Sequence, residues 1–203
     1  YASDLLHDMK ADTQLFVRDL HFQGGQMGNM NLYGRWENEK SAIYLNGHIT
    51  EFGGSDTPVD STQVWNSGHG LCNYIGRTHA EGRISPKYDT IDLMINAENT
   101  NVAFLQGFVG NVFDNISGRT TGWCHIGNTL KDVDITAQMK ADMKAKVRSL
   151  NTTYNIKTDS IQFITNRMRF INVDIIDKDG RKGLAQGDVR HDYLRRMKYE
   201  FRI

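Results

Sequence analysis

The 203-residue chain is poor in residues that rigidify small proteins and in segments that cross membranes. It contains two cysteines and two prolines, too few for a disulfide framework, a collagen-like repeat or a proline-rich linker. Its longest apolar runs, such as 102–105, fall far short of the roughly 20 residues that a membrane-spanning helix needs. The formal net charge is zero. A general nucleic-acid binder needs a basic excess, so no nucleic-acid partner is expected.

Targeting signals are also missing from the chain. Residues 1–4 contain no basic segment and no apolar stretch follows them, so we expect no signal peptide. The chain opens with Tyr1 in place of an initiating Met, which favours a mature chain or a piece of a longer protein. Cys72 and Cys124 form no CxxC pair. Two buried thiols are therefore favoured over a single bridge.

No motif for catalysis or for metal binding is present. The chain has no nucleophile elbow, phosphate-binding loop or catalytic triad, so we expect no enzyme and no catalytic residues. The group His69, Cys72, His79 and Glu81 lacks the ligand spacing of a zinc site. The acidic segment 174–180 lacks the closing Glu of a calcium loop. We therefore predict neither a metal site nor a cofactor.

The strongest positive signal is a period of two in the hydrophobic pattern. Over residues 133–147 every second side chain is apolar and those between are polar, as in a strand with one dry and one wet face. This run is long for one strand, so either one extended strand or two joined by a bulge is expected. The apolar members are Val133, Ile135, Ala137, Met139, Ala141, Met143, Ala145 and Val147.

The same alternation recurs along the whole chain. It appears in 30–36, in 161–163 and in 173–175. Asp179-Gly180, between 173–175 and Leu184, predicts a hairpin turn. Two further runs are more regular, and their apolar members are Ile91, Leu93 and Ile95, then Met197, Tyr199 and Phe201. The pattern indicates an all-β fold.

A weak repeat groups these runs into hairpins. Gly34, Gly82, Gly122 and Gly187 each open a short strand that is followed, after a polar turn, by a second alternating strand. Such a repeat favours an extended meander in which each hairpin packs against its neighbours.

One stretch departs from the β pattern. Apolar residues between 102 and 113 recur at helical spacing, and Thr100 or Asn101 is suited to cap a helix there. We therefore predict one short helix around 102–113 that plugs or flanks the apolar face, or covers its edge. It gives a possible subdivision into 1–98 and 117–203 around an insert at 99–116.

The composition of the 133–147 face suggests two roles. A packed sandwich or barrel core is the simpler one. However, Ala137, Ala141 and Ala145 are small, while Met139 and Met143 are flexible. Such a face leaves adaptable space, as a groove for acyl chains would.

The order of these elements resembles a known family. The blocks 104–108, 115–122, 126–133, 154–161, 173–180 and 187–191, with the upstream strand 32–36, are similar in order and spacing to the C-terminal domain of the TamB (translocation and assembly module) family, in its Bacteroides-type form. No block is specific alone. The resemblance spans roughly residues 13–203; residues 56–71 fit less well, and Cys124 replaces an ordinary apolar residue.

The resemblance implies a fold, a role and partners. TamB belongs to the AsmA-like superfamily of bridge-type lipid transporters, whose elongated, curled antiparallel sheet (a β-taco) has a β-helix-like groove. It implies a periplasmic segment of an inner-membrane-anchored protein that carries phospholipid acyl chains between the inner and outer membranes in outer-membrane biogenesis. The alternative is a scaffold that helps an Omp85-type outer-membrane barrel protein to insert or secrete other proteins.

We therefore expect residues 1–203 to form a single β-taco segment of a longer, non-enzymatic protein. A structural spacer is a third possibility. The predicted groove-lining residues are Val133, Ile135, Ala137, Met139, Ala141, Met143, Ala145, Val147, Ile91, Leu93, Ile95, Met197, Tyr199 and Phe201.

Overall fold

The computed structural model describes residues 11–22, 25–52, 74–106, 110, 113–148, 150–192 and 195–202. These residues form eleven strands and two short 3₁₀ turns. The strands are β1 Asp12–Phe22, β2 Gly25–Glu37, β3 Ala42–Phe52, β4 Tyr74–Ser85, β5 Thr90–Asn101, β6 Phe113–Asn128, β7 Val133–Val147, β8 Thr152–Ile164, β9 Arg167–Ile176, β10 Lys182–Asp192 and β11 Arg195–Arg202. The turns are η1 Asn38–Lys40 and η2 Val102–Leu105.

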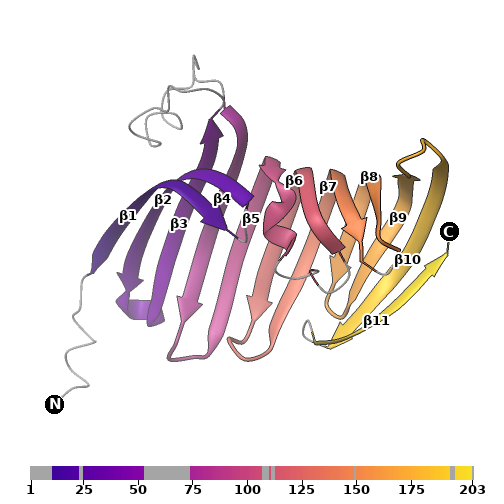
Figure 1. The fold of residues 1–203 in the computed structure, drawn as a ribbon. Coiled ribbons are helices and arrows are strands. Elements are labelled where there is room, and N and C mark those ends of the chain that lie inside the picture. The colour runs from indigo at the N-terminus through magenta and orange to yellow at the C-terminus, as the bar shows by residue number, and fades with distance from the viewer. Residues whose placement is uncertain are drawn as a thin grey trace.

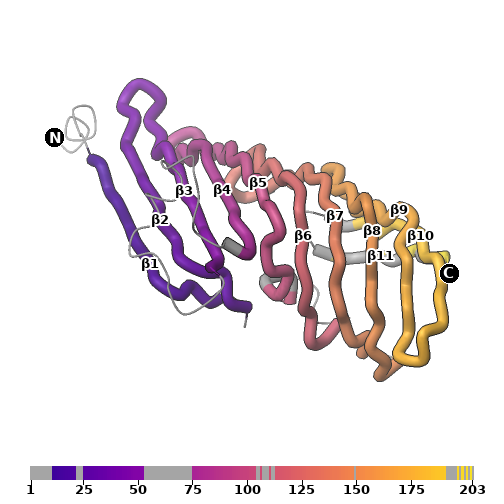
Figure 2. The backbone as a smooth tube through the Cα atoms, turned by 90° about the horizontal axis from the view of Figure 1, so that it is seen from above, coloured from indigo at the N-terminus to yellow at the C-terminus, as the bar shows by residue number. Residues whose placement is uncertain are grey.

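All eleven strands belong to one antiparallel sheet, in which each strand pairs with its neighbours in the sequence. Seen from above, the strands follow one another in chain order from β1 at one end of the row to β10 at the other (Figure 2). The predicted all-β meander of hairpins is therefore confirmed. The predicted subdivision at 99–116 is not a break in the sheet, because β5 pairs with β6 across it.

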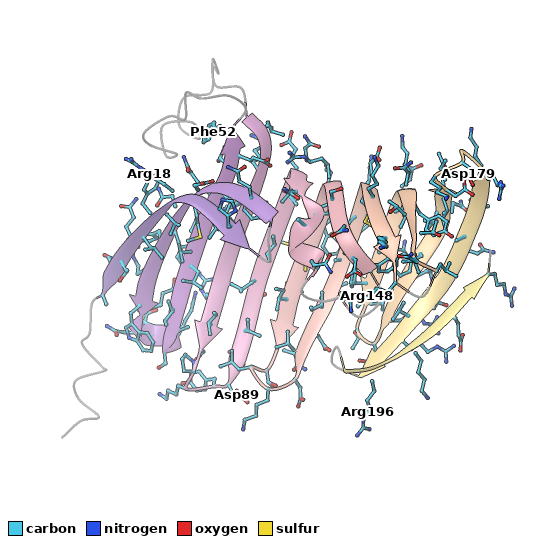
Figure 3. All side chains as sticks on the ribbon, in the orientation of Figure 1. Arg18, Phe52, Asp89, Arg148, Asp179 and Arg196 are labelled. Carbon is cyan, nitrogen blue, oxygen red and sulfur yellow. The ribbon has the colours of Figure 1, made fainter. Side chains whose placement is uncertain are left out.

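The sheet is open and curled. In Figure 1, parts of β1 and β2 at one end of the row, and β11 at the other, bend over the same face of the sheet. Turns lie at both ends of the strands: Asp89 and Arg196 mark one end, and Phe52 and Asp179 the other (Figure 3).

Bulges explain much of the bending. Register shifts occur in β1 around Asp19, in β5 around Asn99 and in β6 around Asn115. Each of these residues has a positive φ, a conformation that Asn and Asp tolerate better than most residues. Because a bulge inserts an extra residue on one strand, it bends that strand and increases its twist.

The longest alternating run is one continuous strand. β7 spans Val133 to Val147 without a bulge of its own; the shifts against it lie in β6 and β8. The turn at the end of β9 is also as predicted, since Gly180 adopts φ +79° between Asp177 and Arg181.

The predicted helix over 102–113 is contradicted only at its last residue; residues 107–109, 111 and 112 lie outside the described part of the structure. The described part begins with the turn η2 and continues into Gln106, whose backbone is α-helical, whereas Phe113 is already the first residue of β6, where it lies opposite Val147. The N-cap prediction is confirmed at Asn101, whose side chain accepts a hydrogen bond of 2.9 Å from the amide of Ala103. Pairing with β7 therefore overrides the helical spacing at the end of the segment.

Candidate functional site

The candidate site is one face of the sheet, here called the apolar face. It is the face to which the alternate residues Val133 to Val147 of β7 point, together with the residues directly opposite them on neighbouring strands. Residues that face each other across antiparallel strands point to the same side. The strand register therefore assigns side chains to this face across the whole sheet.

One row of small and apolar residues crosses all eleven strands through Ala137. Each member lies directly opposite the next, and for the last one only the backbone is described. The row is Leu15, Leu32, Gly47, Ala80, Ile95, Cys124, Ala137, Phe163, Met168, Val189 and Tyr199. Because no charged residue interrupts it, the row is a continuous uncharged strip that crosses the sheet from β1 to β11.

A second row, through Met139, runs beside the first. It also crosses the eleven strands, and Thr78 is its only polar member; for Phe201 only the backbone is described. The row is Val17, Met30, Ile49, Thr78, Ala97, Gly122, Met139, Ile161, Phe170, Gly187 and Phe201. Two parallel rows make the apolar face a band rather than a line.

Shorter rows widen this band on both sides. On one side Ile135 lies opposite Ile126, which lies opposite Leu93. Ile91 extends the same side of β5 and lies opposite Ile84 on β4. On the other side Met143 lies opposite Ile156. All eight predicted residues of β7, and Ile91, Leu93 and Ile95, thus belong to the apolar face.

The three predicted residues of β11 are placed only in part. The backbones of Tyr199 and Phe201 pair with Val189 and Gly187, as residues of the apolar face would. Met197 is also in β11, and the side chains of all three lie outside the described part of the structure.

Little of the described chain covers the apolar face. On β7 the three alanines are buried, whereas Met139 and Met143 are only partly buried. Among the described residues one compact cluster lies near η2, where fully buried Val102 packs with residues of β6 to β10; it comprises Val102, Ile116, Ala145, Ile156, Val173 and Ala185. A sheet with an apolar face normally buries that face against a second layer. Here no second sheet or long helix is present among the described elements.

The opposite face is polar along β7. Lys140, Asp142 and Lys144 are exposed there, as the alternation predicts, and Arg119 lies opposite Asp142. On β3 and β4 the His48 and His79 rings stack with centroids 4.4 Å apart. Burial, and then the neighbouring His79, lowers the pKa of His48.

Small residues allow the strands of the apolar face to approach closely. Gly118 on β6 has φ +128°, and a Cβ there would lie 2.3 Å from the carbonyl oxygen of Asp142. Cys124 is a free thiol on the same strand, and burial raises its pKa to about 11. A buried thiol with a raised pKa lacks the thiolate character of a nucleophilic cysteine.

The described ranges offer no metal-binding cluster as an alternative candidate site. They contain no group of three or more His, Cys, Asp or Glu side chains that could hold a metal ion. His79 lies 3.9 Å from Glu81, while His69 and Cys72 lie outside the described residues. None of the described helical turns is long and apolar enough to span a membrane.

Sequence reasoning missed several members of the apolar rows. In β9 the even-numbered residues Met168 and Phe170 belong to the rows. Beyond Asn172 the odd-numbered Val173 points to the same face. Asn172, at φ +50°, lies between them. The bulge changes the phase of the alternation and hides the longer run. An Asn inside an apolar segment was the available signal.

Comparison with protein-family models, with curated proteins and with solved structures finds no match for this chain.

Proposed function

We propose that this chain binds phospholipid acyl chains on its apolar face, as a non-enzymatic periplasmic segment of a TamB-like protein that carries lipid between the inner and outer membranes. One observation supports the proposal most strongly: two apolar rows cross all eleven strands, and no second sheet or long helix among the described elements packs on them, so that most of their described side chains are only partly buried. An apolar surface of this extent calls for an apolar partner.

The mechanism is passive guidance. An acyl chain lies along the rows through Ala137 and Met139 while its headgroup stays in water. Each CH₂ removed from water contributes about 0.8 kcal/mol, and this attraction has no preferred direction. A chain can therefore move from strand to strand without breaking a directional bond. The adaptable Met139 and Met143 side chains accommodate its changing position.

The direct test is native mass spectrometry of the protein purified from cells without detergent. We expect a population carrying a phospholipid mass. Ile95→Asp, which places a carboxylate on the apolar face, should remove that population. Asn96→Asp places the same carboxylate on the opposite, exposed side of β5 and should leave it unchanged. Protein free of lipid under all conditions would contradict the proposal.

A second candidate function, docking of an Omp85-type barrel, is favoured by the sheet's open edges. Among the described strands, β1 and β11 each pair with one neighbour only, and such edges can add a strand from a partner. Phe16→Pro, at a residue on the opposite side of β1 from Val17, should then abolish co-purification with the barrel while lipid capture persists. Unchanged barrel co-purification would contradict this second role.

A further inference from the structure

The start of β2 touches a part of the sheet that lies beyond two intervening strands. Gly25 lies so close to Ala103 that a Cβ on Gly25 would lie 2.5 Å from the Ala103 Cβ. One residue along, the side-chain amide of Asn101 donates a hydrogen bond of 3.1 Å to the carbonyl oxygen of Gln26. In the sheet, β3 and β4 separate β2 from β5. Figure 1 shows β2 bending across the sheet toward η2.

An ion pair ties the same region together. Glu51 at the end of β3 accepts two hydrogen bonds from the guanidinium of Arg119 on β6, one of them 3.0 Å long between Oε1 and Nη2. The Glu51 side chain is only 11% exposed. In a flat sheet three strand spacings, about 14 Å, separate β3 from β6. Such a pair therefore requires the sheet to be strongly curled here.

The residues at the contact between the start of β2 and η2 allow the two segments to lie close together and to separate again. Gly25 has no side chain to obstruct Ala103. Asn101 also caps η2, and Arg119 lies opposite Asn101 in the register. The turn η2, which buries Val102 against the sheet, thus holds the start of β2 near the end of β5. Among the described residues, β2 meets this region through the Asn101–Gln26 hydrogen bond and the Gly25–Ala103 approach, and the Glu51–Arg119 ion pair joins β3 to β6 nearby.

We propose that these contacts form a latch that keeps the apolar face closed over β2–β5, and that its release opens this part of the face to an acyl chain. The inference rests on the proposed lipid-binding function. The rest of the face, toward β11, lies beyond the latch. The latch therefore controls access at the N-terminal end of the row of strands.

A pair of substitutions tests the latch by moving one methyl group. Gly25→Ala adds a methyl where Ala103 already stands and should release β2 from η2. Adding Ala103→Gly removes the conflicting methyl and should restore the contact. Gly34→Ala is the matched control in the same strand, because its new Cβ would lie 3.6 Å from Leu45, an ordinary contact.

Two measurements read the result. Amide hydrogen exchange around 26–31 and 101–106 should become at least tenfold faster in Gly25→Ala and return to normal in the double variant. Uptake of a fluorescent phospholipid from phosphatidylethanolamine–phosphatidylglycerol vesicles should be several-fold faster in Gly25→Ala only. Gly34→Ala should resemble the wild type in amide exchange, the measurement for which it is the control.

A reversible lock gives the opposite perturbation. Gly25→Cys with Ala103→Cys, in a Cys72→Ser, Cys124→Ser background, needs a shift of only about 1 Å to reach the usual Cβ separation of a disulfide. The oxidised form should take up lipid at least tenfold more slowly, and reduction should reverse this. If Gly25→Ala and the oxidised double-cysteine variant both take up lipid at the wild-type rate, the latch is wrong while the proposed lipid-binding function stands. If amide hydrogen exchange changes as expected but neither the wild type nor any variant captures lipid, the proposed function itself is contradicted.

Discussion

Cys124 on β6 lies directly opposite Ala137 on β7, in the middle of the apolar face. Its other neighbour in the row is Ile95. Since burial disfavours the charged thiolate, the pKa of this thiol rises to about 11. The reactivity of the Cys124 thiol therefore measures how well this part of the apolar face excludes water.

We expect Cys124 to react slowly with thiol reagents. At pH 8, a pKa near 11 leaves about a hundredfold less thiolate than an ordinary cysteine has. In a Cys72→Ser background, alkylation of the folded protein should be slower than that of the urea-unfolded protein by about this factor. Equal rates in both states would contradict the placement of Cys124 on a dry face.

Met139→Asp separates a lipid-binding face from a structural spacer. The carboxylate would lie between Gly122 and Ile161, and we expect a loss of about 1–3 kcal/mol in the free energy of unfolding. We also expect lipid capture to be abolished, while Met139→Leu keeps both properties. A variant that is less stable yet captures lipid normally would favour the spacer. Urea denaturation and lipid extraction measure the two effects.

Gly118→Ala should strongly destabilise the sheet. The added methyl would meet the Asp142 carbonyl oxygen at 2.3 Å in a backbone conformation with φ +128°. Backbone strain of this kind costs about 1–3 kcal/mol, and the clash adds to it. Gly34→Ala, whose methyl meets no close contact, should change the free energy of unfolding far less. Similar losses in both variants would contradict the close approach of β6 and β7.

The stability of the sheet should fall in mild acid because of His48. Its pKa is lowered from 6.5, first by burial and then by His79, while Glu81 opposes the shift. The unfolded chain therefore binds a proton at His48 more readily than the folded protein. This contribution to stability is fully present above pH 6.5 and is lost as the pH falls below it. Urea unfolding at pH 7.5 and 5.5 measures the loss, and His48→Phe should make it smaller. A loss of the same size in His48→Phe would assign it to other groups.

Local alternation predicted the strands because each strand has one apolar side. Residues 133–147 are the clearest case, since no bulge interrupts β7. The register between strands was beyond this reasoning. Bulges at Asn99, Asn115 and Asn172 depend on how neighbouring strands meet, and they shift the phase of the pattern. The continuous rows through Ala137 and Met139 emerge only once that register is known.

The end of the predicted helix at Phe113 was misplaced for a similar reason. The apolar spacing there is helical, yet Phe113 pairs with Val147. The Gln106 side chain donates a hydrogen bond of 2.8 Å to the Phe113 carbonyl oxygen and accepts one of 3.3 Å from the Ile116 amide. These contacts join the turn η2 to the bulged start of β6. At Phe113 this tertiary pairing outweighs the helical spacing of the apolar residues.

The most direct test of the central claim compares two consecutive residues of β7. Met139 lies on the apolar face and Lys140 on the opposite, exposed side. A photo-activated crosslinking amino acid is placed at each position in cells, and the captured molecules are identified by mass spectrometry. The account predicts phospholipid adducts at Met139 and none at Lys140. Adducts at Lys140 alone, or equal capture at both positions, would contradict it.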